Sequence, residues 1–425
     1  MELQLAKGTK DISGEEEILK QEILSSLKKN FELYGFNPLS TKILERLDTL
    51  TSKYAGGEEI TKEIFKLTDQ GSRDLALRYD LTVPFSRFVG MNKEIKMPFK
   101  RYEMGVVFRD GPIKLGRYRE FWQCDADVVG SQTMLAEIEL LSLAKDFFES
   151  LNLNVTIKVN NRKILDEIMS SSQIPEELRN KTILILDKLE KFGLQEVKKE
   201  LTELGLSETE ITKLLKFITF KGNNKEKVNF LRKEIKDAEA LKEITEILDI
   251  LDFVEFDLSL ARGLAYYTST VFEVFVKDSE IKSSIAAGGR YDKMIGNLLE
   301  SSQPYPAVGI SFGLSVIIDA LKLQRKEQQK KTVTTVYIIP IGTQQQCLDL
   351  AGKLRKKGIN TEVDINKKSI SKNLDYANYY KIPYVIIIGE DELKKGKFKL
   401  KDMAAGSEKF LDEKELLKEL KWTSI

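Results

Sequence analysis

Residues 108–127 read FRDGPIKLGRYREFWQCDAD and are the most informative stretch of this sequence. Apolar residues flank a short loop that contains glycine and proline, which predicts two strands joined by a hairpin. Arg109, Arg117 and Arg119 surround the loop, and Phe121 stands among polar neighbours. Guanidinium groups bind phosphate and carboxylate at two points, and an aromatic ring offers a face for a base. A surface hairpin with solvated arginines remains the alternative at this point.

A second cluster lies in LALRYDLTVPFSRF, residues 75–88. Asp80 and Thr82 follow the apolar run of an expected strand, where an acid can pair with an amine of a ligand. Pairing with a neighbouring arginine is the commoner use of such an acid, so both interpretations stay open here.

The third cluster is LARGLAYYTSTVFEVF, residues 260–275. Its second half has the β-branched and aromatic residues of a strand. Arg262, Tyr266 and Tyr267 precede that strand, although a strand that only packs needs neither a guanidinium nor two phenols.

The fourth cluster is AAGGRYDKMIG, residues 286–296. The pair Gly288-Gly289 lets the backbone come close to a ligand, since neither residue carries a side chain. A bulge or a turn is the structural alternative.

The composition is that of a globular protein with more than one domain. At 425 residues the chain exceeds a single compact core, and it has 42% hydrophobic and 31% charged residues. No apolar run approaches the roughly 20 residues of a membrane helix, and the first residues lack the apolar core of a signal peptide. We therefore expect a cytoplasmic protein without a membrane partner. Two cysteines cannot form a disulfide framework or a four-thiolate zinc site.

Histidine is absent from the sequence. This excludes Ser-His-Asp and Cys-His catalysis, histidine-ligated metals and imidazole bases, so any chemistry depends on carboxylates, Arg, Lys, Tyr and backbone groups. The net charge is +1, but the residues from Lys331 onward carry +5. That charge weakly indicates a phosphate-backbone partner, and a solvated lysine-rich surface explains it equally well.

The pattern of strands and helices predicts two domains and an insertion. A helix and a short strand are expected up to about residue 50, short strands and turns alternate over 64–130, and a helix at 135–150 precedes another strand. A charged helical block covers 161–247, and strands then resume. We predict a first domain over 1–322 that contains this block, a linker at 323–331 and a second domain over 332–425. The second domain alternates strand and helix from residue 335, which predicts a small parallel sheet.

Together these segments resemble histidyl-tRNA synthetase, a class II aminoacyl-tRNA synthetase. The resemblance covers the whole chain and is carried, in the family's order, by KGTKDI (7–12), FKLTDQGSRDLALRYDLTVPFSRF (65–88), the arginine loop, ARGLAYY (261–267), AAGGRYD (286–292) and YVIIIGEDELKKGK (384–397). It implies an α+β fold, with an antiparallel-sheet catalytic domain, a helical insertion and a C-terminal α/β anticodon-binding domain.

The resemblance also implies an activity. Members of the family activate L-histidine with ATP and Mg²⁺ to histidyl-adenylate and transfer it to the 3′ end of tRNA(His), and they act as homodimers. We identify no side chains that would fix the metal.

The family's functional residues match positions of this sequence. The resemblance makes Arg262 and Arg109 the catalytic pair, which contacts the substrate carboxylate and the α-phosphate of ATP. Asp127 would accept an imidazole N–H, and Asp80 and Thr82 would receive the α-amino group. The histidine-binding set is Asp80, Leu81, Thr82, Arg109, Gln123, Asp127, Arg262, Tyr266, Tyr267, Gly288, Gly289 and Tyr291. The ATP-binding set is Arg109, Arg117, Arg119, Phe121 and Gly313, with Phe121 stacking on the adenine.

Two positions depart from the family pattern. Lys42 replaces a proline in the first class II motif, YGFNPLSTKILE (34–45), which builds the dimer interface; we expect a small effect. Val316 replaces the arginine of the third motif, AVGISFGLSVII (307–318), which holds the γ-phosphate of ATP. We expect another cation to supply this contact, or weaker ATP binding.

Two alternatives to a synthetase follow from the same motifs. One is a catalytically inactive histidine sensor, such as the synthetase-like regulatory subunit of ATP phosphoribosyltransferase. Val316 favours it, whereas Arg109, Arg262 and the C-terminal domain argue against it. The other is a domain that binds uncharged tRNA as a signal, but such a protein would carry an effector segment, which we do not find.

The missing histidines fit a regulatory hypothesis. A synthetase for histidine that contains no histidine can still be translated when its charged tRNA is exhausted. Compositional drift is the alternative explanation.

Overall fold

The computed structural model describes residues 2–52, 61–113, 118–235, 238–262, 266–301, 303–324 and 330–421. The chain forms two compact units, one of residues 1–11 and 23–324 and the other of residues 12–22 and 325–425. The residues that line the cavity described below all belong to the first unit.

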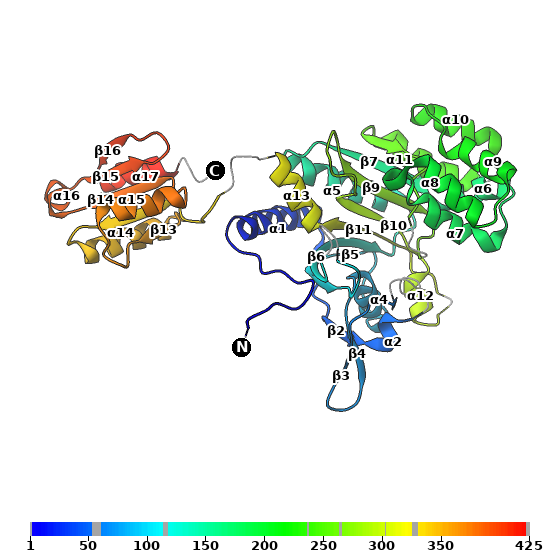
Figure 1. The fold of residues 1–425 in the computed structure, drawn as a ribbon, viewed down its shortest axis with the longest axis horizontal. Helices are drawn as coiled ribbons and strands as arrows, with labels where there is room; N and C mark the ends of the chain where they lie inside the picture. Colours follow the sequence, from blue (N-terminus) through cyan, green and yellow to red (C-terminus); the bar gives the residue numbers. More distant parts are fainter. Residues whose placement is uncertain are drawn as a thin grey trace. The chain divides into compact units, whose positions relative to one another are not determined.

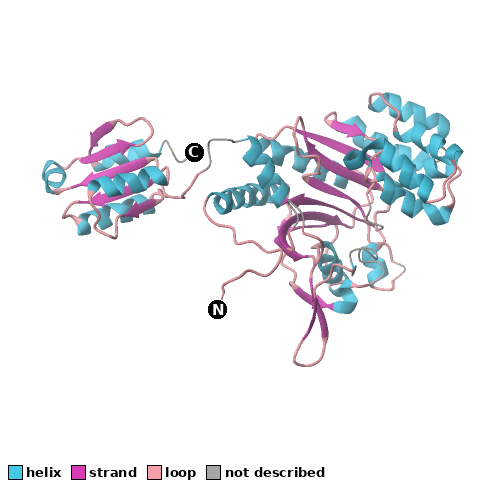
Figure 2. Cartoon of the chain, viewed as in Figure 1, coloured by secondary structure: helices cyan, strands magenta, loops and turns pink. Residues whose placement is uncertain are grey.

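The first unit is built on a sheet of eight strands in the order β1-β5-β6-β11-β10-β9-β7-β8 (Figures 1 and 2). Only the edge pairs β1–β5 and β7–β8 are parallel. The strands are β1 (Asn37–Pro38), β5 (Phe99–Phe108), β6 (Glu120–Val129), β7 (Val155–Asn161), β8 (Val254–Phe256), β9 (Thr270–Val276), β10 (Ala286–Arg290) and β11 (Ala307–Gly313). The strands β5 and β6 form the hairpin that the arginine loop predicts, and the predicted antiparallel sheet is confirmed.

One face of this sheet is covered by helices α1 (Glu15–Leu33), α5 (Leu135–Ser150) and α13 (Leu314–Gln324). Side chains alternate between the two faces of a strand, so every second residue of β11 points to these helices. Phe312 is one of them, and its ring lies 5.8 Å from that of Phe31, 5.2 Å from Phe147 and 5.8 Å from Phe148. The opposite face is left for the site.

A smaller sheet of β2 (Leu44–Arg46), β4 (Asp74–Leu77) and β3 (Lys66–Thr68), in that order, forms the projection at the bottom of Figure 1. Helices α2 (Leu47–Leu50), α4 (Thr82–Met91) and α12 (Met294–Leu298) complete this part. The strand expected before Asp80 ends at Leu77, and the helix α4, which the sequence did not predict, begins at Thr82. Pro84 falls in the first turn of α4, where a missing N–H costs nothing, and Asp80 Oδ1 accepts a hydrogen bond from the Val83 N–H.

Six helices occupy the segment between β7 and β8, coloured green in Figure 1. They are α6 (Arg162–Ser171), α7 (Glu176–Leu186), α8 (Leu189–Glu203), α9 (Glu208–Ile218), α10 (Asn224–Glu234) and α11 (Ala238–Ile250). Capping boxes begin two of them: Ser207 pairs with Glu210 at α9, and Asn223 pairs with Glu226 at α10. Each box satisfies backbone N–H groups that the first turn of a helix leaves unbonded.

The second unit contains a five-stranded sheet in the order β13-β12-β14-β15-β16. Its elements are β12 (Val336–Pro340), α14 (Gln344–Lys356), β13 (Thr361–Val363), α15 (Ile370–Tyr379), β14 (Tyr384–Ile388), α16 (Glu390–Lys395), β15 (Phe398–Asp402), β16 (Glu408–Leu411) and α17 (Glu413–Lys421). The first three strands are parallel, as expected.

Two further strands, β15 and β16, were not predicted from the sequence, and they pair antiparallel. Charged residues dominate both strands, so their sequence resembles a solvated segment. Lys399 and Lys401 pair across the strands with Glu408, and these cross-strand ion pairs support the hairpin.

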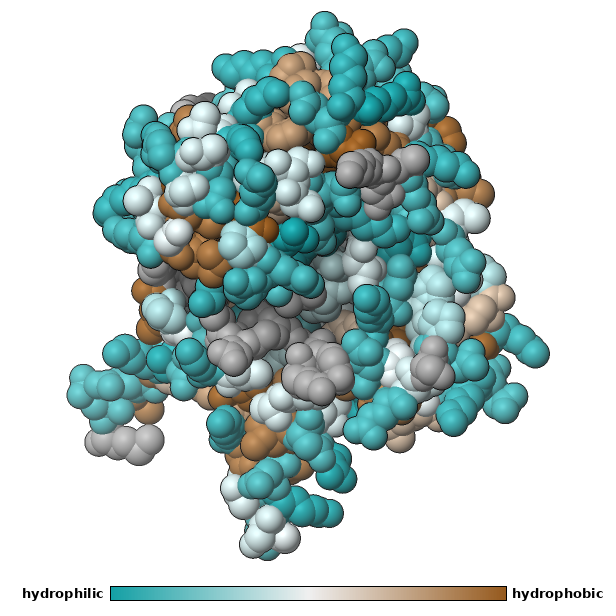
Figure 3. Space-filling view, turned by 90° about the vertical axis from the view of Figure 1, so that its right-hand side faces the viewer, coloured by the Kyte–Doolittle hydropathy of each residue, from teal (hydrophilic) through white to brown (hydrophobic). Residues whose placement is uncertain are grey.

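Hydrophilic side chains predominate on the face of the protein in Figure 3, with apolar side chains in scattered patches. Among the described residues, the helices include none with both the length and the apolar composition needed to cross a membrane.

Replacing Phe312 by alanine should destabilise the first unit strongly. The side chain is fully buried, so its loss leaves a cavity among three aromatic rings and should cost about 3–5 kcal/mol. Chemical denaturation measures this cost. Phe192→Ala is the matched control, because Phe192 is 65% exposed, and it should change stability little. Equal effects of the two substitutions would contradict the packing described here.

Candidate functional site

A cavity of about 1140 Å³ lies on the face of the main sheet that is opposite Phe312. The strands β10 and β11 form its floor, and the residues of these strands that face it are small: Ala287, Gly289, Gly309, Ser311 and Gly313. The register places Ala287 opposite Ser311 and Gly289 opposite Gly309. Side chains of this size leave a hollow that larger residues would fill.

The glycines are also required by close packing. A Cβ on Gly309 would lie 2.0 Å from Asp127 Oδ1, and a Cβ on Gly289 would lie 2.8 Å from the ring of Tyr267. Gly288 belongs to the other face of β10, where a Cβ would lie 2.4 Å from the Phe272 ring. Both glycines of the AAGGRYD motif line the cavity. A side chain at either position would also clash with a neighbouring ring.

The strand β6 presents Gln123, Asp125 and Asp127 to the cavity at alternate positions. Asp127 is held firmly: Arg101 Nη2 lies 2.7 Å from its Oδ2, and the Tyr291 hydroxyl donates to its Oδ1. Burial raises the pKa of Asp127, and Arg101 and Tyr291 oppose that shift.

A second buried ion pair lies beside the first. Arg78 Nη1 is 2.8 Å from Glu103 Oε1, and the N–H and hydroxyl of Thr41 also donate to this carboxylate. Gly105 makes room for the pair, since a Cβ there would lie 2.2 Å from Arg78 Nη2. Lys42, which follows Thr41 in the chain, is exposed.

The start of α4 brings Asp80 and Thr82 to the cavity. Asp80 is buried, and burial raises its pKa to about 6, while its hydrogen bond from Val83 and the charge of Arg109 act in the opposite direction. Leu81 lies between them and is buried; its carbonyl oxygen accepts a hydrogen bond from Arg101 Nη2.

The arginines of the hairpin loop occupy different places. Arg109 lines the cavity, its Nε donates to the Tyr79 carbonyl, and its guanidinium lies 5.1 Å from the centre of the Phe121 ring. Arg119 pairs with Asp110 at 2.9 Å. Neither Arg119 nor Phe121 is among the residues lining the cavity. The predicted residue Arg117 lies outside the described residues.

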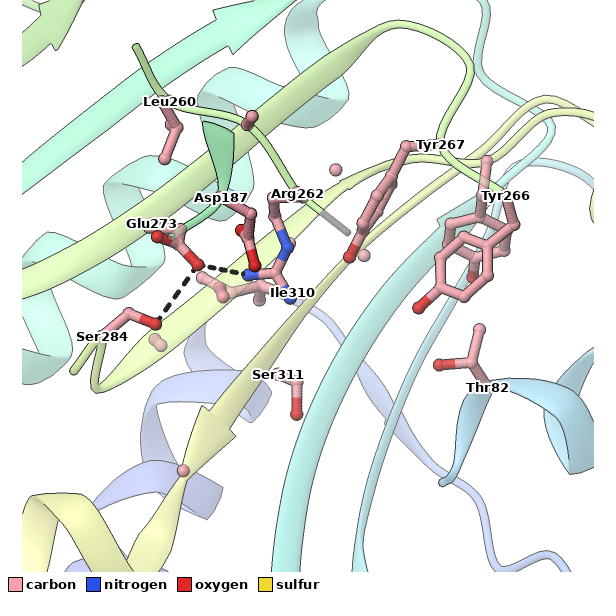
Figure 4. Close-up of a pocket in the computed structure, with 18 of the residues that line it drawn as sticks. Thr82, Asp187, Leu260, Arg262, Tyr266, Tyr267, Glu273, Ser284, Ile310 and Ser311 are labelled. Carbon is pink, nitrogen blue, oxygen red and sulfur yellow. Dashed lines mark hydrogen bonds and ion pairs between the residues drawn. The ribbon is translucent and has the colours of Figure 1, made fainter. Parts of the chain in front are cut away.

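Arg262 lines the cavity beside two carboxylates, those of Glu273 and Asp187 (Figure 4). Its Nη1 lies 2.9 Å from Oε1 of Glu273, and Ser284 donates to the same oxygen. Asp187, which follows α7 of the helical segment, also lies beside the guanidinium. Burial lowers the pKa of Arg262, but the charges of Glu273 and Asp187 and the nearby phenols raise it above its ordinary value.

Three tyrosines form one wall of the cavity. The ring of Tyr266 lies 4.7 Å from that of Tyr267 and 6.1 Å from that of Tyr291. Figure 4 shows Tyr266 and Tyr267 beside Thr82. Burial raises the pKa of all three phenols, which therefore stay protonated and able to donate hydrogen bonds at neutral pH.

The structure adds residues that the sequence interpretation did not include: Arg101, Asp125, Glu273 and Asp187. The alternation of β6 could have indicated Asp125, because it stands midway between two residues already chosen. Glu273 was the one charged residue in the strand half of its motif. Nothing in the sequence around Asp187 indicated a place beside Arg262.

Among the described residues, no group of three or more aspartate, glutamate, cysteine or histidine side chains could hold a metal ion.

Comparison with known proteins identifies the family. The family model described as histidyl-tRNA synthetase matches residues 8–317, and that of an anticodon binding domain matches residues 335–422. The chain belongs to the histidyl-tRNA synthetase family. A protein of Bacillus cereus named histidine–tRNA ligase 1 is 45% identical over 421 residues, which cover 96% of this chain and 97% of that protein. A histidine–tRNA ligase of Bacteroides fragilis is 38% identical, and the matched region covers 97% of this chain and 98% of that protein.

Solved structures agree with this family assignment. The crystal structure of histidyl-tRNA synthetase from Nostoc sp. PCC 7120 has a TM-score of 0.87 at 29% identity, over 100% of both chains. A structure from Bacillus halodurans described as an ATP phosphoribosyltransferase regulatory subunit/histidyl-tRNA synthetase has a TM-score of 0.74 at 20% identity. The matched region covers 91% of this chain and 98% of that chain. At this identity the similarity shows only that the two proteins share a fold. The fold class and family predicted from the motifs are confirmed.

Replacing Gly309 by alanine should weaken histidine binding at least about tenfold. The new methyl group would overlap Asp127 Oδ1, so the carboxylate must leave its place beside Arg101. Histidine titration by calorimetry measures the effect. Gly352→Ala, where nothing lies within 4 Å of the new Cβ, is the control and should bind normally. Unchanged affinity of the Gly309 variant would show that the close contact is unimportant.

Proposed function

We infer that this chain is a histidine–tRNA ligase, which activates L-histidine with ATP and transfers the histidyl group to the 3′ end of tRNA(His). The observation that carries this conclusion is the 45% identity to a histidine–tRNA ligase over almost the full length of both chains. The cavity supports it, since the motif residues on which the resemblance rests converge there from distant parts of the sequence.

The chemistry needs charge stabilisation rather than a protein base. The carboxylate of histidine attacks the α-phosphorus of ATP, a carboxyl O–P bond forms, and the bond to the leaving pyrophosphate breaks. The attacking group is already ionised at neutral pH, so a chain without histidine lacks nothing for this step. We propose that Arg262 and Arg109 neutralise the carboxylate and the α-phosphate. Their fixed hydrogen bonds, to Glu273 and to the Tyr79 carbonyl, support a preorganised role.

Recognition of the amino acid is proposed to use the rest of the cavity wall. Asp80 and Thr82 would receive the α-amino group, and Asp127 would accept an imidazole N–H. The rigid hold of Arg101 and Tyr291 on Asp127 supports this, because a fixed buried acceptor left unpaired by another side chain imposes a large penalty. Gln123, Tyr266, Tyr267, Tyr291, Leu81, Gly288 and Gly289 complete the proposed pocket.

ATP is proposed to extend from Arg109 towards Phe121, with Arg117, Arg119 and Gly313 as further contacts. Synthetases of this class use ATP with Mg²⁺. Since the described residues provide no cluster of metal ligands, we propose that the ion is held mainly by the phosphates. Lys181 and Lys282 also line the cavity and are the candidates for the contact that Val316 cannot make.

The remaining partners follow from the family. We propose that the anticodon-binding domain contacts tRNA(His), which its charge of +5 from Lys331 onward supports. Homodimerisation and a cytoplasmic location are proposed on the same basis. Lys42 is exposed, so its charge remains solvated in the free chain.

The inactive regulatory subunit is not favoured. The relatives at 43–46% identity are named histidine–tRNA ligase, whereas similarity to the structure described as a regulatory subunit is only 20% in sequence.

Arg262→Ala should reduce histidine-dependent ATP–pyrophosphate exchange by about 100-fold or more. Loss of a preorganised donor at the reacting charge typically costs this much in rate. Arg46→Ala is the control, because Arg46 is exposed and pairs only locally with Asp48. No exchange by the wild-type chain at any ATP concentration, with histidine still bound, would favour the sensor interpretation instead.

Val316→Arg should lower the KM for ATP about tenfold, since a charge-assisted hydrogen bond to phosphate contributes about 1.5–3 kcal/mol. Val316 lies in the first turn of α13, where its Cγ2 would be 3.8 Å from a Cβ on Gly313 of the cavity. Val316→Ala should leave the KM for ATP unchanged. An unaltered KM in the arginine variant would mean that another cation already supplies the contact.

A further inference from the structure

Asp125 lies at the centre of the cavity without an assigned role. It stands on β6 between Gln123 and Asp127, lines the cavity, and is 3% exposed. Within the described part of the chain, its Oδ1 is buried and makes no hydrogen bond. A buried polar atom without a partner costs free energy, so its retention at a binding cavity points to a ligand group.

The charges around Asp125 do not neutralise it. The cation that acts on Asp125 is Arg101 on β5, which is already 2.7 Å from Asp127 and 3.8 Å from Glu103. The other titratable groups that face Asp125 are the carboxyls of Asp127 and Asp80 and the phenol of Tyr267. The carboxyls of Asp127, Asp125 and Glu103 thus share the guanidinium of Arg101, and Asp125 has no counter-charge of its own.

We propose that Asp125 is a specificity-determining residue that pairs with an N–H of the substrate imidazole, which is then bound as an imidazolium. The inference deepens the proposed function and rests on it. Asp127, two residues along the same strand face, is proposed to take the other ring nitrogen. Asp80 at the start of α4 remains for the α-amino group. The two ring nitrogens and the α-amino nitrogen of the amino acid then each meet one carboxylate.

The proton for the imidazolium comes from Asp125 itself. Burial raises the pKa of Asp125 to about 8, with Arg101 and Ser311 opposing and Asp127 and Asp80 adding to the shift. At pH 7 the free protein therefore holds a protonated Asp125, and free imidazole, with a pKa of about 6.5, is mostly neutral. On binding, the carboxyl O–H bond breaks and a ring N–H bond forms, so no proton is exchanged with water.

This arrangement has a definite pH dependence. Above pH 8 Asp125 is ionised in the free protein, so binding requires a proton from solution and the histidine KM rises with pH. Asparagine at position 125 has no carboxyl proton to give to the imidazole. The additional rise of the histidine KM above pH 8 should therefore disappear in this variant. The amino group of histidine titrates in the same way in both assays. Its effect on KM therefore cancels when the variant KM is divided by the wild-type KM at each pH.

The test measures histidine KM by ATP–pyrophosphate exchange at saturating ATP between pH 6.5 and 9, for wild type, Asp125→Asn and Glu120→Gln. Glu120 is an exposed carboxylate on the same strand and is the control. Asp125→Asn should raise histidine KM about tenfold at pH 7, leave the KM for ATP unchanged, and abolish the additional rise above pH 8. Parallel pH profiles for wild type and Asp125→Asn would overturn the proposal.

A second measurement separates the imidazole from the amino group. Imidazole-lactate, which has the ring but no amine, should inhibit Asp125→Asn about tenfold more weakly than wild type. Equal inhibition of the two proteins would assign Asp125 to the amine and sink the imidazolium proposal. Wild-type protein without any histidine-dependent exchange would instead refute the proposed function, so the two failures are distinguishable.

Discussion

The buried ion pair of Arg101 and Asp127 is the interaction on which the site depends. Arg101 is fully buried, and it connects β5 to β6 through Asp127 and to the start of α4 through the Leu81 carbonyl. The Tyr291 hydroxyl adds the end of β10 to the same group, because Tyr291 directly follows that strand. Removing one partner of such a pair leaves an unpaired buried charge and costs about 3–5 kcal/mol. Four elements are thus held in place around one carboxylate.

The cavity extends this principle to its other charges. Arg78 pairs with Glu103, and Arg262 pairs with Glu273, so the guanidinium groups are oriented before a ligand arrives. Glycine at positions 105 and 309 is needed because the charged groups lie where a Cβ would be. The described residues of the cavity thus offer both cations and carboxylates to a ligand, and they include no cluster that could hold a metal ion.

Arg262 also links the inserted helices to the site, since Asp187 faces its guanidinium (Figure 4). Asp187 follows α7, whereas Glu273, the other carboxylate beside Arg262, belongs to β9 of the main sheet. Neutralisation of this arginine therefore depends on two parts of the first unit that are far apart in the chain.

Local sequence patterns were enough to identify the family and most of the residues that line the cavity. Strand alternation predicted the β5–β6 hairpin, and the motif residues identified Arg109, Asp127 and Arg262, because local composition and order are properties of the chain alone. These patterns did not predict the start of α4, where a proline inside an apolar run was compatible with either structure, or the charged strands β15 and β16.

Which charged side chains meet depends on the tertiary structure. Asp125 faces Ser311 because of the register between β6 and β11, and Asp187 reaches Arg262 because of how the helices fold back on the sheet. Register and helix placement are set by packing between segments distant in sequence, and no local pattern of residues encodes them.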